Sequence, residues 1–143
     1  MIVKKILVPV RGRGVDDDAL KLACTVAQKP KAKLYVLYII EVARDLPLDA
    51  HVDEEMGKAE EVLTHAEDIA ADIGYDIDTD LIQSRDIGSA IVDEVVQRNV
   101  DLVVMGIGYR NPRGKFDLGD IIPYVLKESP CQVLVYRGYK PAE

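Results

Sequence analysis

The sequence predicts a three-layer α/β/α domain of Rossmann-like type, with a five-stranded parallel sheet. Two observations predict this fold class. Short runs of β-branched and other apolar residues alternate along the chain with longer segments of helical period. Several of these runs are almost wholly apolar, which is typical of parallel strands that are covered on both faces. Because no linker rich in Pro, Gly or Ser divides the 143 residues, we expect one domain over residues 1–143.

The first half of the chain predicts two buried strands, each followed by a helix. The strands are expected at residues 5–9 and 34–40, which are nearly continuous apolar runs. A helix that begins near three aspartates and ends before Pro30 follows the first strand. Its apolar stripe consists of Ala19, Leu22, Ala23, Val26 and Ala27. A longer helix is expected at 53–73, with Gly74 as its C-terminal cap.

The second half repeats the alternation. Residues 77–82 alternate between apolar and polar, which indicates an edge or half-buried strand. Asp86 or Ser89 caps the next helix, whose inward positions are expected to be Ile87, Ala90, Ile91, Val95 and Val96. Strands are expected at 102–106 and 131–136. Between them lie a loop rich in Gly and Arg at 107–118 and a short helix that Asp120 opens. We expect residues 138–143 to be a frayed tail.

Composition narrows the classes of function. The formal net charge of −7 argues against a general nucleic-acid binder. No apolar run is long enough to cross a bilayer and no leader is visible, so we expect a cytoplasmic protein. Cys24 and Cys131 form no CxxC motif and are expected to be reduced, although the sequence alone leaves a disulfide open. His51 and His65 have no partner at metal-ligand spacing, and no catalytic constellation is visible.

A ligand is expected at the carboxyl ends of the strands, where loops follow the first and fourth strands. These two loops carry five cations: Arg11, Arg13, Arg110, Arg113 and Lys115. They either solvate the exposed loops or pair with Asp16, Asp17, Asp117 and Asp120, or they converge to hold a small anionic ligand. Both interpretations remain open at this point.

Three blocks of the sequence resemble one family. They are Lys-Lys-Ile-Leu-Val-Pro-Val at 4–10, Asp-Leu-Val-Val-Met-Gly at 101–106 and Ser-Pro-Cys-Gln-Val-Leu-Val at 129–135. In this order and in these elements they resemble the universal stress protein family along nearly the whole chain. The resemblance implies the strand order 3-2-1-4-5. It also implies a homodimer that pairs through the last strand, residues 131–136, which would protect an apolar edge strand.

One branch of that family binds ATP through a signature after the fourth strand: Gly, two residues, Gly, nine residues, then Gly-Ser or Gly-Thr. This chain keeps Gly106 and Gly119. The second glycine position holds Tyr109, next to Gly108, and the hydroxyl position holds Asp120. After the first strand, Arg11 replaces the family's usual aspartate, which in ATP binders helps to hold the nucleoside. A carboxylate near a phosphate repels it by roughly 4 kcal/mol at about 4 Å and surface-like dielectric.

Two functions follow. The first is a non-catalytic, homodimeric stress protein without standard ATP binding, which acts through protein contacts or by sensing an anion. The alternative is a switch that binds ATP or another adenine nucleotide through a modified phosphate loop, with slow hydrolysis left open. An enzyme of the wider superfold is a weaker option, because fold alone does not imply activity. The residues expected around a nucleotide are Pro9, Val10, Arg11, Ile39, Met105, Gly106, Gly108, Tyr109, Gly119, Asp120 and Ile121.

Overall fold

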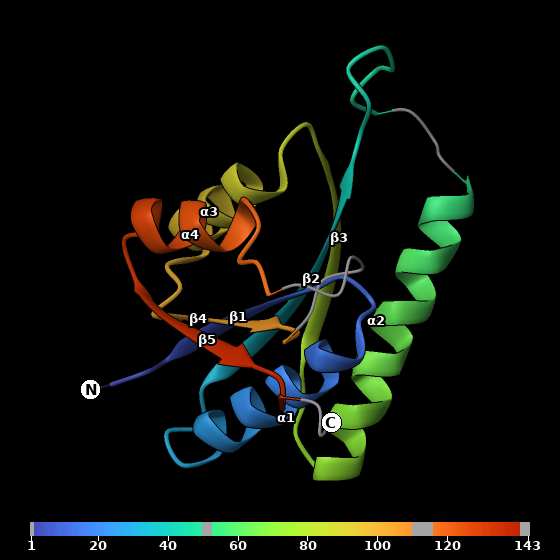
Figure 1. Cartoon of the computed structure of the whole chain (residues 1–143). Coiled ribbons are helices and arrows are strands. Elements are labelled where there is room, and N and C mark those ends of the chain that lie inside the picture. Colours follow the sequence, from blue (N-terminus) through green and yellow to red (C-terminus); the bar gives the residue numbers. More distant parts are fainter. Residues whose placement is uncertain (1, 50–52, 110–115, 141–143) are drawn as a thin grey trace.

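Strands and helices alternate throughout the computed structural model, which describes residues 2–49, 53–109 and 116–140 (Figure 1). In chain order the elements are β1 (Lys5–Val10), α1 (Gly14–Gln28), β2 (Lys33–Glu41), α2 (Asp53–Ile73), β3 (Asp78–Ser84), α3 (Ile87–Arg98), β4 (Leu102–Ile107), α4 (Ile121–Glu128) and β5 (Gln132–Arg137). Each element expected from the sequence is present, and the bounds of the strands shift by one or two residues.

The five strands form one parallel sheet in the order β3-β2-β1-β4-β5, which confirms the predicted fold class and strand order. β1 lies at the centre and pairs with β2 on one side and with β4 on the other. The order of the strands therefore reverses beside β1. In sheets of this kind, the loops after the two strands at the reversal diverge and leave a crevice between them.

Two helices cover each face of the sheet. Leu20 of α1 and Leu63 of α2 pack in one core cluster against Val8 and Val36. On the other face, α3 and α4 contribute a second cluster that includes Ile91 and Val125. Figure 1 shows the same arrangement, with α3 and α4 on one side of the strands and α1 and α2 on the other. None of the described helices is long and apolar enough to cross a membrane.

The expected inward faces of two helices need correction. In α3, Val96 is 58% exposed, because the helix turns Val95 rather than its neighbour toward the sheet. In α1, Leu20 and Cys24 are buried, whereas Leu22 and Val26 are only half-buried. Alanines are small and occur on both faces of helices, so an apolar stripe that contains several of them defines the buried face only to within about one residue.

Two expected helix ends are as predicted, and the tail is not frayed throughout. The side chain of Asp86 accepts a hydrogen bond from the backbone N–H of Ser89, so Asp86 caps α3. Gly74 follows α2 with a φ of +85°, a backbone conformation that favours glycine. At the other end of the chain, Gly138 donates its N–H to the carbonyl oxygen of Ile107 at 2.8 Å. The expected frayed tail therefore does not include Gly138, and residues 141–143 lie outside the described residues.

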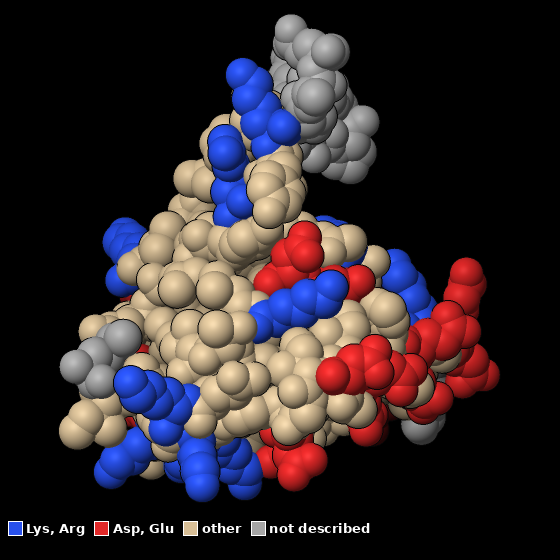
Figure 2. Space-filling model, turned by 90° about the horizontal axis from the view of Figure 1, so that it is seen from below, with Lys and Arg blue, Asp and Glu red and all other residues tan. Residues whose placement is uncertain are grey.

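The acidity of the chain is concentrated on α2. This helix carries eight carboxylate side chains and one lysine, a net −7 that equals the formal charge of the whole chain. All eight acidic residues are exposed. Figure 2 shows acidic side chains gathered at the side where α2 lies in Figure 1. The remainder of the chain is neutral overall, so the net charge does not argue against an anionic ligand at the carboxyl edge of the sheet.

Candidate functional site

A cleft of about 700 Å³ opens at the carboxyl ends of β1 and β4, where the strand order reverses. The loop between β1 and α1 forms one wall, and the segment that leads into α4 forms the opposite one. The lining residues are Pro9, Val10, Arg11, Arg13, Gly14, Val15, Leu37, Ile39, Ile87, Ile91, Met105, Gly106, Ile107, Gly108, Asp117, Leu118, Gly119, Asp120, Ile121 and Ile122. Ten of the eleven residues expected around a nucleotide are in this set, and Tyr109 is the exception.

One part of the cleft is apolar. Leu37 and Ile39 of β2 lie there with Met105 of β4, and α3 adds Ile87 and Ile91. All five pack in the core cluster between the sheet and the helices α3 and α4. Sequence reasoning missed Leu37 and the two α3 residues. The alternation of β2, which puts residues 37 and 39 on one face, was a signal that would have found Leu37.

The wall between β1 and α1 is held by Asp16, which is 3% exposed. One of its carboxylate oxygens accepts the backbone N–H groups of Arg11, at 2.7 Å, and Arg13, at 3.2 Å. The guanidinium of Arg13 donates to the other oxygen at 2.8 Å and to the carbonyl oxygen of Gly106 at 2.8 Å. Arg13, one of the expected anion contacts, is therefore already paired with an aspartate, which was one of the two interpretations of these cations.

Arg11 differs from Arg13. It is exposed and lines the cleft, and its guanidinium makes no hydrogen bond or ion pair with any described residue. The remaining expected anion contacts, Arg110, Arg113 and Lys115, lie outside the described residues.

Two glycines that line the cleft, Gly106 of β4 and Gly119 before α4, have distinct roles. A Cβ atom at Gly106 would lie 3.1 Å from the carbonyl oxygen of Val15 and 3.3 Å from the Cβ of Ala19. The glycine therefore permits the close approach of α1 to β4. Gly119 has a φ of +67° with open space around it, so its backbone conformation is the reason for glycine there.

Two carboxylate side chains, those of Asp117 and Asp120, lie just before the first residue of α4. Asp117 accepts the backbone N–H of Gly119 at 2.8 Å. Asp120 occupies the N-cap position, but its side chain makes no capping hydrogen bond, contrary to the expected role. Both residues line the cleft and are exposed. The carboxylate of Asp120 therefore has no described partner and is directed to no backbone group of its own helix.

Tyr109 lies beyond the cleft, at the base of the loop that follows β4. Its ring centroid is 6.0 Å from that of Phe116. The guanidinium of Arg137 lies 5.0 Å from the Tyr109 ring, and the ammonium of Lys140 lies 5.9 Å from it. These are cation–π distances, so Tyr109 connects the loop to the end of β5.

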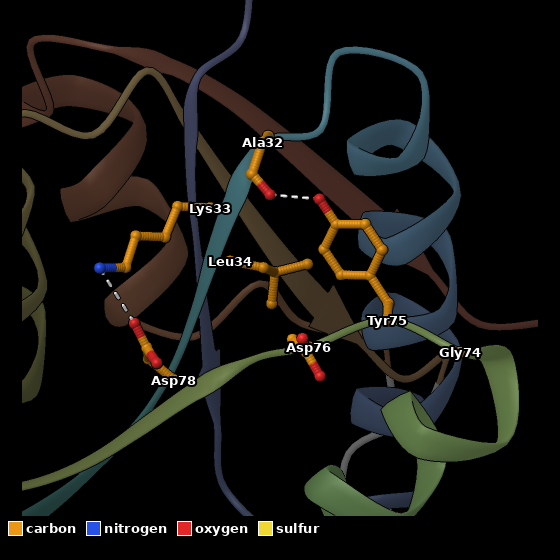
Figure 3. A pocket seen from close by; sticks show the side chains of 7 residues that line it. All are labelled: Ala32, Lys33, Leu34, Gly74, Tyr75, Asp76 and Asp78. Carbon is orange, nitrogen blue, oxygen red and sulfur yellow. Dashed lines mark hydrogen bonds and ion pairs between the residues drawn. The ribbon is translucent and has the colours of Figure 1, made fainter.

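A second hollow, of about 400 Å³, lies at the amino ends of β2 and β3. Figure 3 shows Lys33 and Asp78 directed toward one another, at 3.3 Å, and the Tyr75 hydroxyl directed toward the carbonyl oxygen of Ala32. Burial raises the pKa of Tyr75, which favours the protonated hydroxyl that donates here. Lys33, Asp78 and the Tyr75 hydroxyl of this hollow are thus already paired, so the cleft at the carboxyl edge is the better candidate site.

The two cysteines do not form a disulfide, and each is a free thiol. Cys24 is buried in α1, and Cys131 is half-buried with its Sγ 3.3 Å from the hydroxyl oxygen of Ser129. His65 of α2 lies 3.0 Å from a carboxylate oxygen of Asp17, which joins α2 to α1. His51 lies outside the described residues.

A parallel sheet in this order, with a cleft at its reversal point, defines a Rossmann-like α/β domain whose candidate site lies above β1 and β4. The chain belongs to the universal stress protein family, whose sequence profile matches residues 3–137. A universal stress protein of Methanocaldococcus jannaschii is 27% identical over 145 residues, which cover 97% of this chain and 85% of the relative.

Solved structures of the family share the fold. A universal stress protein from Archaeoglobus fulgidus in complex with dAMP has a TM-score of 0.74 at 21% identity, and the match covers 94% of this chain and 98% of that one. A universal stress protein in complex with cAMP has a TM-score of 0.75 at 22% identity, with 94% and 97% covered. At these identities the likeness establishes the fold of this chain.

Proposed function

We propose that the cleft binds a purine nucleotide that carries a single phosphate, and that the protein responds to this ligand as a switch. The observation that carries the proposal is the composition of the cleft, with an apolar part at β2 and α3 and a glycine-rich part at β4 and α4. Relatives with the same fold hold dAMP and cAMP. These findings favour the nucleotide alternative over a protein that acts through protein contacts alone.

The two parts of the cleft suit the two parts of a nucleotide. A purine is flat and apolar on its faces, so it gains most from the region of Leu37, Ile39 and Met105. Phosphate oxygens accept hydrogen bonds from backbone N–H groups, which glycines and helix N-termini expose. In this cleft, Gly108 and the N-terminus of α4 are the places that suit a phosphate in this way.

The carboxylates of Asp117 and Asp120 line the same part of the cleft, and they oppose a chain of phosphates. A monophosphate can be held at some distance from them, whereas a triphosphate fills more of this wall and adds charge of the same sign. The proposal therefore keeps the expectation that standard ATP binding is lost, while the nucleoside part of the site is retained.

Isothermal titration calorimetry tests this function. We expect AMP to bind the wild-type protein with micromolar affinity, and ATP to bind more weakly both with and without Mg²⁺. Titration of ribose 5-phosphate controls for binding that needs the phosphate alone. If neither AMP nor IMP gives measurable heat or shifts the thermal transition at millimolar concentration, the proposed function is wrong.

We also propose that two copies of the chain pair through β5. This strand forms an outer edge of the sheet, and its residues 133–136 are half-buried in the single chain. An edge strand with apolar side chains is protected when it pairs with a copy of itself. Light scattering during size-exclusion chromatography measures the molar mass, and twice the 15.9 kDa of one chain is expected. A mass of one chain at micromolar concentration would contradict pairing.

A further inference from the structure

We infer that Arg11 sets the base preference of the cleft and favours a 6-oxopurine, guanine or hypoxanthine, over adenine. This inference rests on the proposed function, because it requires that a purine nucleotide occupies the cleft. It concerns which purine the cleft prefers.

Arg11 lines the cleft directly after the end of β1, next to the strand that carries the apolar part. In the pairing of β1 with β2, Pro9 is opposite Leu37 and Val10 is opposite Tyr38. Arg11 is the first residue after β1, and it lines the same cleft as Leu37 and Ile39. Side chains along a strand alternate between faces, and Leu7 of β1 packs with Leu37 and Ile39 against α3. From the continuation of this alternation by one step past Pro9 we infer that the Arg11 side chain extends on the same side. The glycine-rich part of the cleft, by contrast, follows β4, on the other side of β1.

Arg11 is the polar side chain of that apolar part. The other described residues that line it are Pro9, Leu37, Ile39, Ile87, Ile91 and Met105, none of which has a hydrogen-bonding side chain. Arg13 is not available, since its guanidinium already donates to Asp16 and to the carbonyl oxygen of Gly106. The backbone N–H of Arg11 donates to Asp16 at 2.7 Å, which fixes the point from which its side chain extends.

The chemistry of guanidinium determines which base edge it matches. Arginine has five N–H donors and no acceptor. The O6 and N7 atoms of guanine or hypoxanthine are two adjacent acceptors, and together they take a bidentate pair from one guanidinium. Adenine presents an amino donor in place of O6, so one N–H of the guanidinium would face another donor. An arginine whose guanidinium has no partner among the described residues and that lies beside the base therefore selects the 6-oxopurine.

IMP and AMP form the matched pair of probes, because they differ only at the 6-position of the base and its protonation at N1. We expect the wild-type protein to bind IMP about tenfold more tightly than AMP, the effect of one good bidentate contact. In Arg11→Met, which keeps the length of the side chain and removes its donors, the two affinities should become equal within about twofold. Arg44→Met, at an exposed arginine outside the cleft, should keep the wild-type ratio.

The outcomes separate this inference from the proposed function. If neither nucleotide binds, the proposed function itself fails. If both bind but AMP is equal to or tighter than IMP in the wild-type protein, the base preference is overturned, whatever the variant does. If Arg11 contacts phosphate instead, Arg11→Met weakens IMP and AMP by the same factor and leaves inosine and adenosine unchanged. That result would also overturn the inference.

Discussion

The guanidinium of Arg13 lies 2.8 Å from the carboxylate of Asp16, and this pair fixes the wall of the cleft next to β1. Asp16 is the single buried charged side chain among the described residues. The side chain of Arg13 is 40% exposed, so the pair is half inside the protein and half at its surface. The same carboxylate also receives two backbone N–H groups, which makes it the centre of the loop between β1 and α1.

The first prediction concerns this carboxylate. Asp16→Asn replaces one acceptor oxygen with an amino group that faces existing donors, so we expect a loss of about 2 kcal/mol in the free energy of unfolding. Urea denaturation measures it. Asp17→Asn is the matched control, because the Asp17 carboxylate makes only an exposed contact with His65 and should cost under about 1 kcal/mol. Equal losses in the two variants would contradict the role of Asp16.

The second prediction concerns Gly106. In Gly106→Ala the added methyl group meets the backbone of Val15 and the Cβ of Ala19 at 3.1 and 3.3 Å, so α1 must shift. We expect a loss of about 1–3 kcal/mol by denaturation, the usual cost of overpacking. Gly57→Ala in α2 is the control, because nothing lies within 4 Å of its added Cβ. That exchange should stabilise the protein by up to about 1 kcal/mol. An unchanged stability in Gly106→Ala would show that α1 adapts freely.

The fold was largely predictable from the sequence because buried parallel strands leave continuous apolar runs, and helices of this length keep their period. The errors lie where the period is ambiguous. Val95 and Val96 are neighbours separated by about 100° around α3, and only the packed structure decides which faces the sheet. The lining of the cleft was also predictable near the carboxyl ends of the strands, as at Pro9, Ile39 and Met105.

The pairing of charges was not predictable to the same degree. Five cations on two loops suggested a convergent anion site, but the sequence does not say which of them meets an acid first. Arg13 and Asp16 are three residues apart at the start of a helix, which brings their side chains together. Arg11 is five residues from Asp16, too far along the chain for the same pairing. Only the structure shows that its guanidinium forms no ion pair with a described acid.

The third prediction concerns pH. Burial raises the pKa of the Cys24 thiol above its ordinary value of 9.0. Above pH 9.0 the Cys24 thiol keeps its proton in the folded state but loses it in the unfolded state, so the unfolded chain binds fewer protons. The stabilising effect is complete below pH 9.0 and is lost as the pH rises through the folded pKa.

Urea denaturation between pH 7 and pH 10.5 measures this dependence. We expect the free energy of unfolding to fall from about pH 9 upward, and to fall less steeply in Cys24→Ala. Tyr75 has a raised pKa for the same reason, so part of the slope should remain in that variant. Parallel curves for Cys24→Ala and the wild-type protein would contradict the assignment.

The last prediction concerns Asp120, which lines the cleft without a described partner for its carboxylate. Asp120→Ser removes a negative charge from the wall that receives phosphate and supplies a hydroxyl donor. Because Asp120 is exposed, screening reduces the repulsion to about 1 kcal/mol, so we expect ATP to bind roughly fivefold to tenfold more tightly. AMP, with fewer charges, should change by less than about threefold. Asp93→Ser, on the exposed face of α3, should change neither affinity.

Titrations with and without Mg²⁺ distinguish the opposite role, in which Asp120 holds a cation that bridges to phosphate. In that case the exchange would abolish the Mg²⁺ dependence of ATP binding and weaken ATP in the presence of the metal, and the carboxylate would be a ligand of the site rather than its barrier to triphosphates.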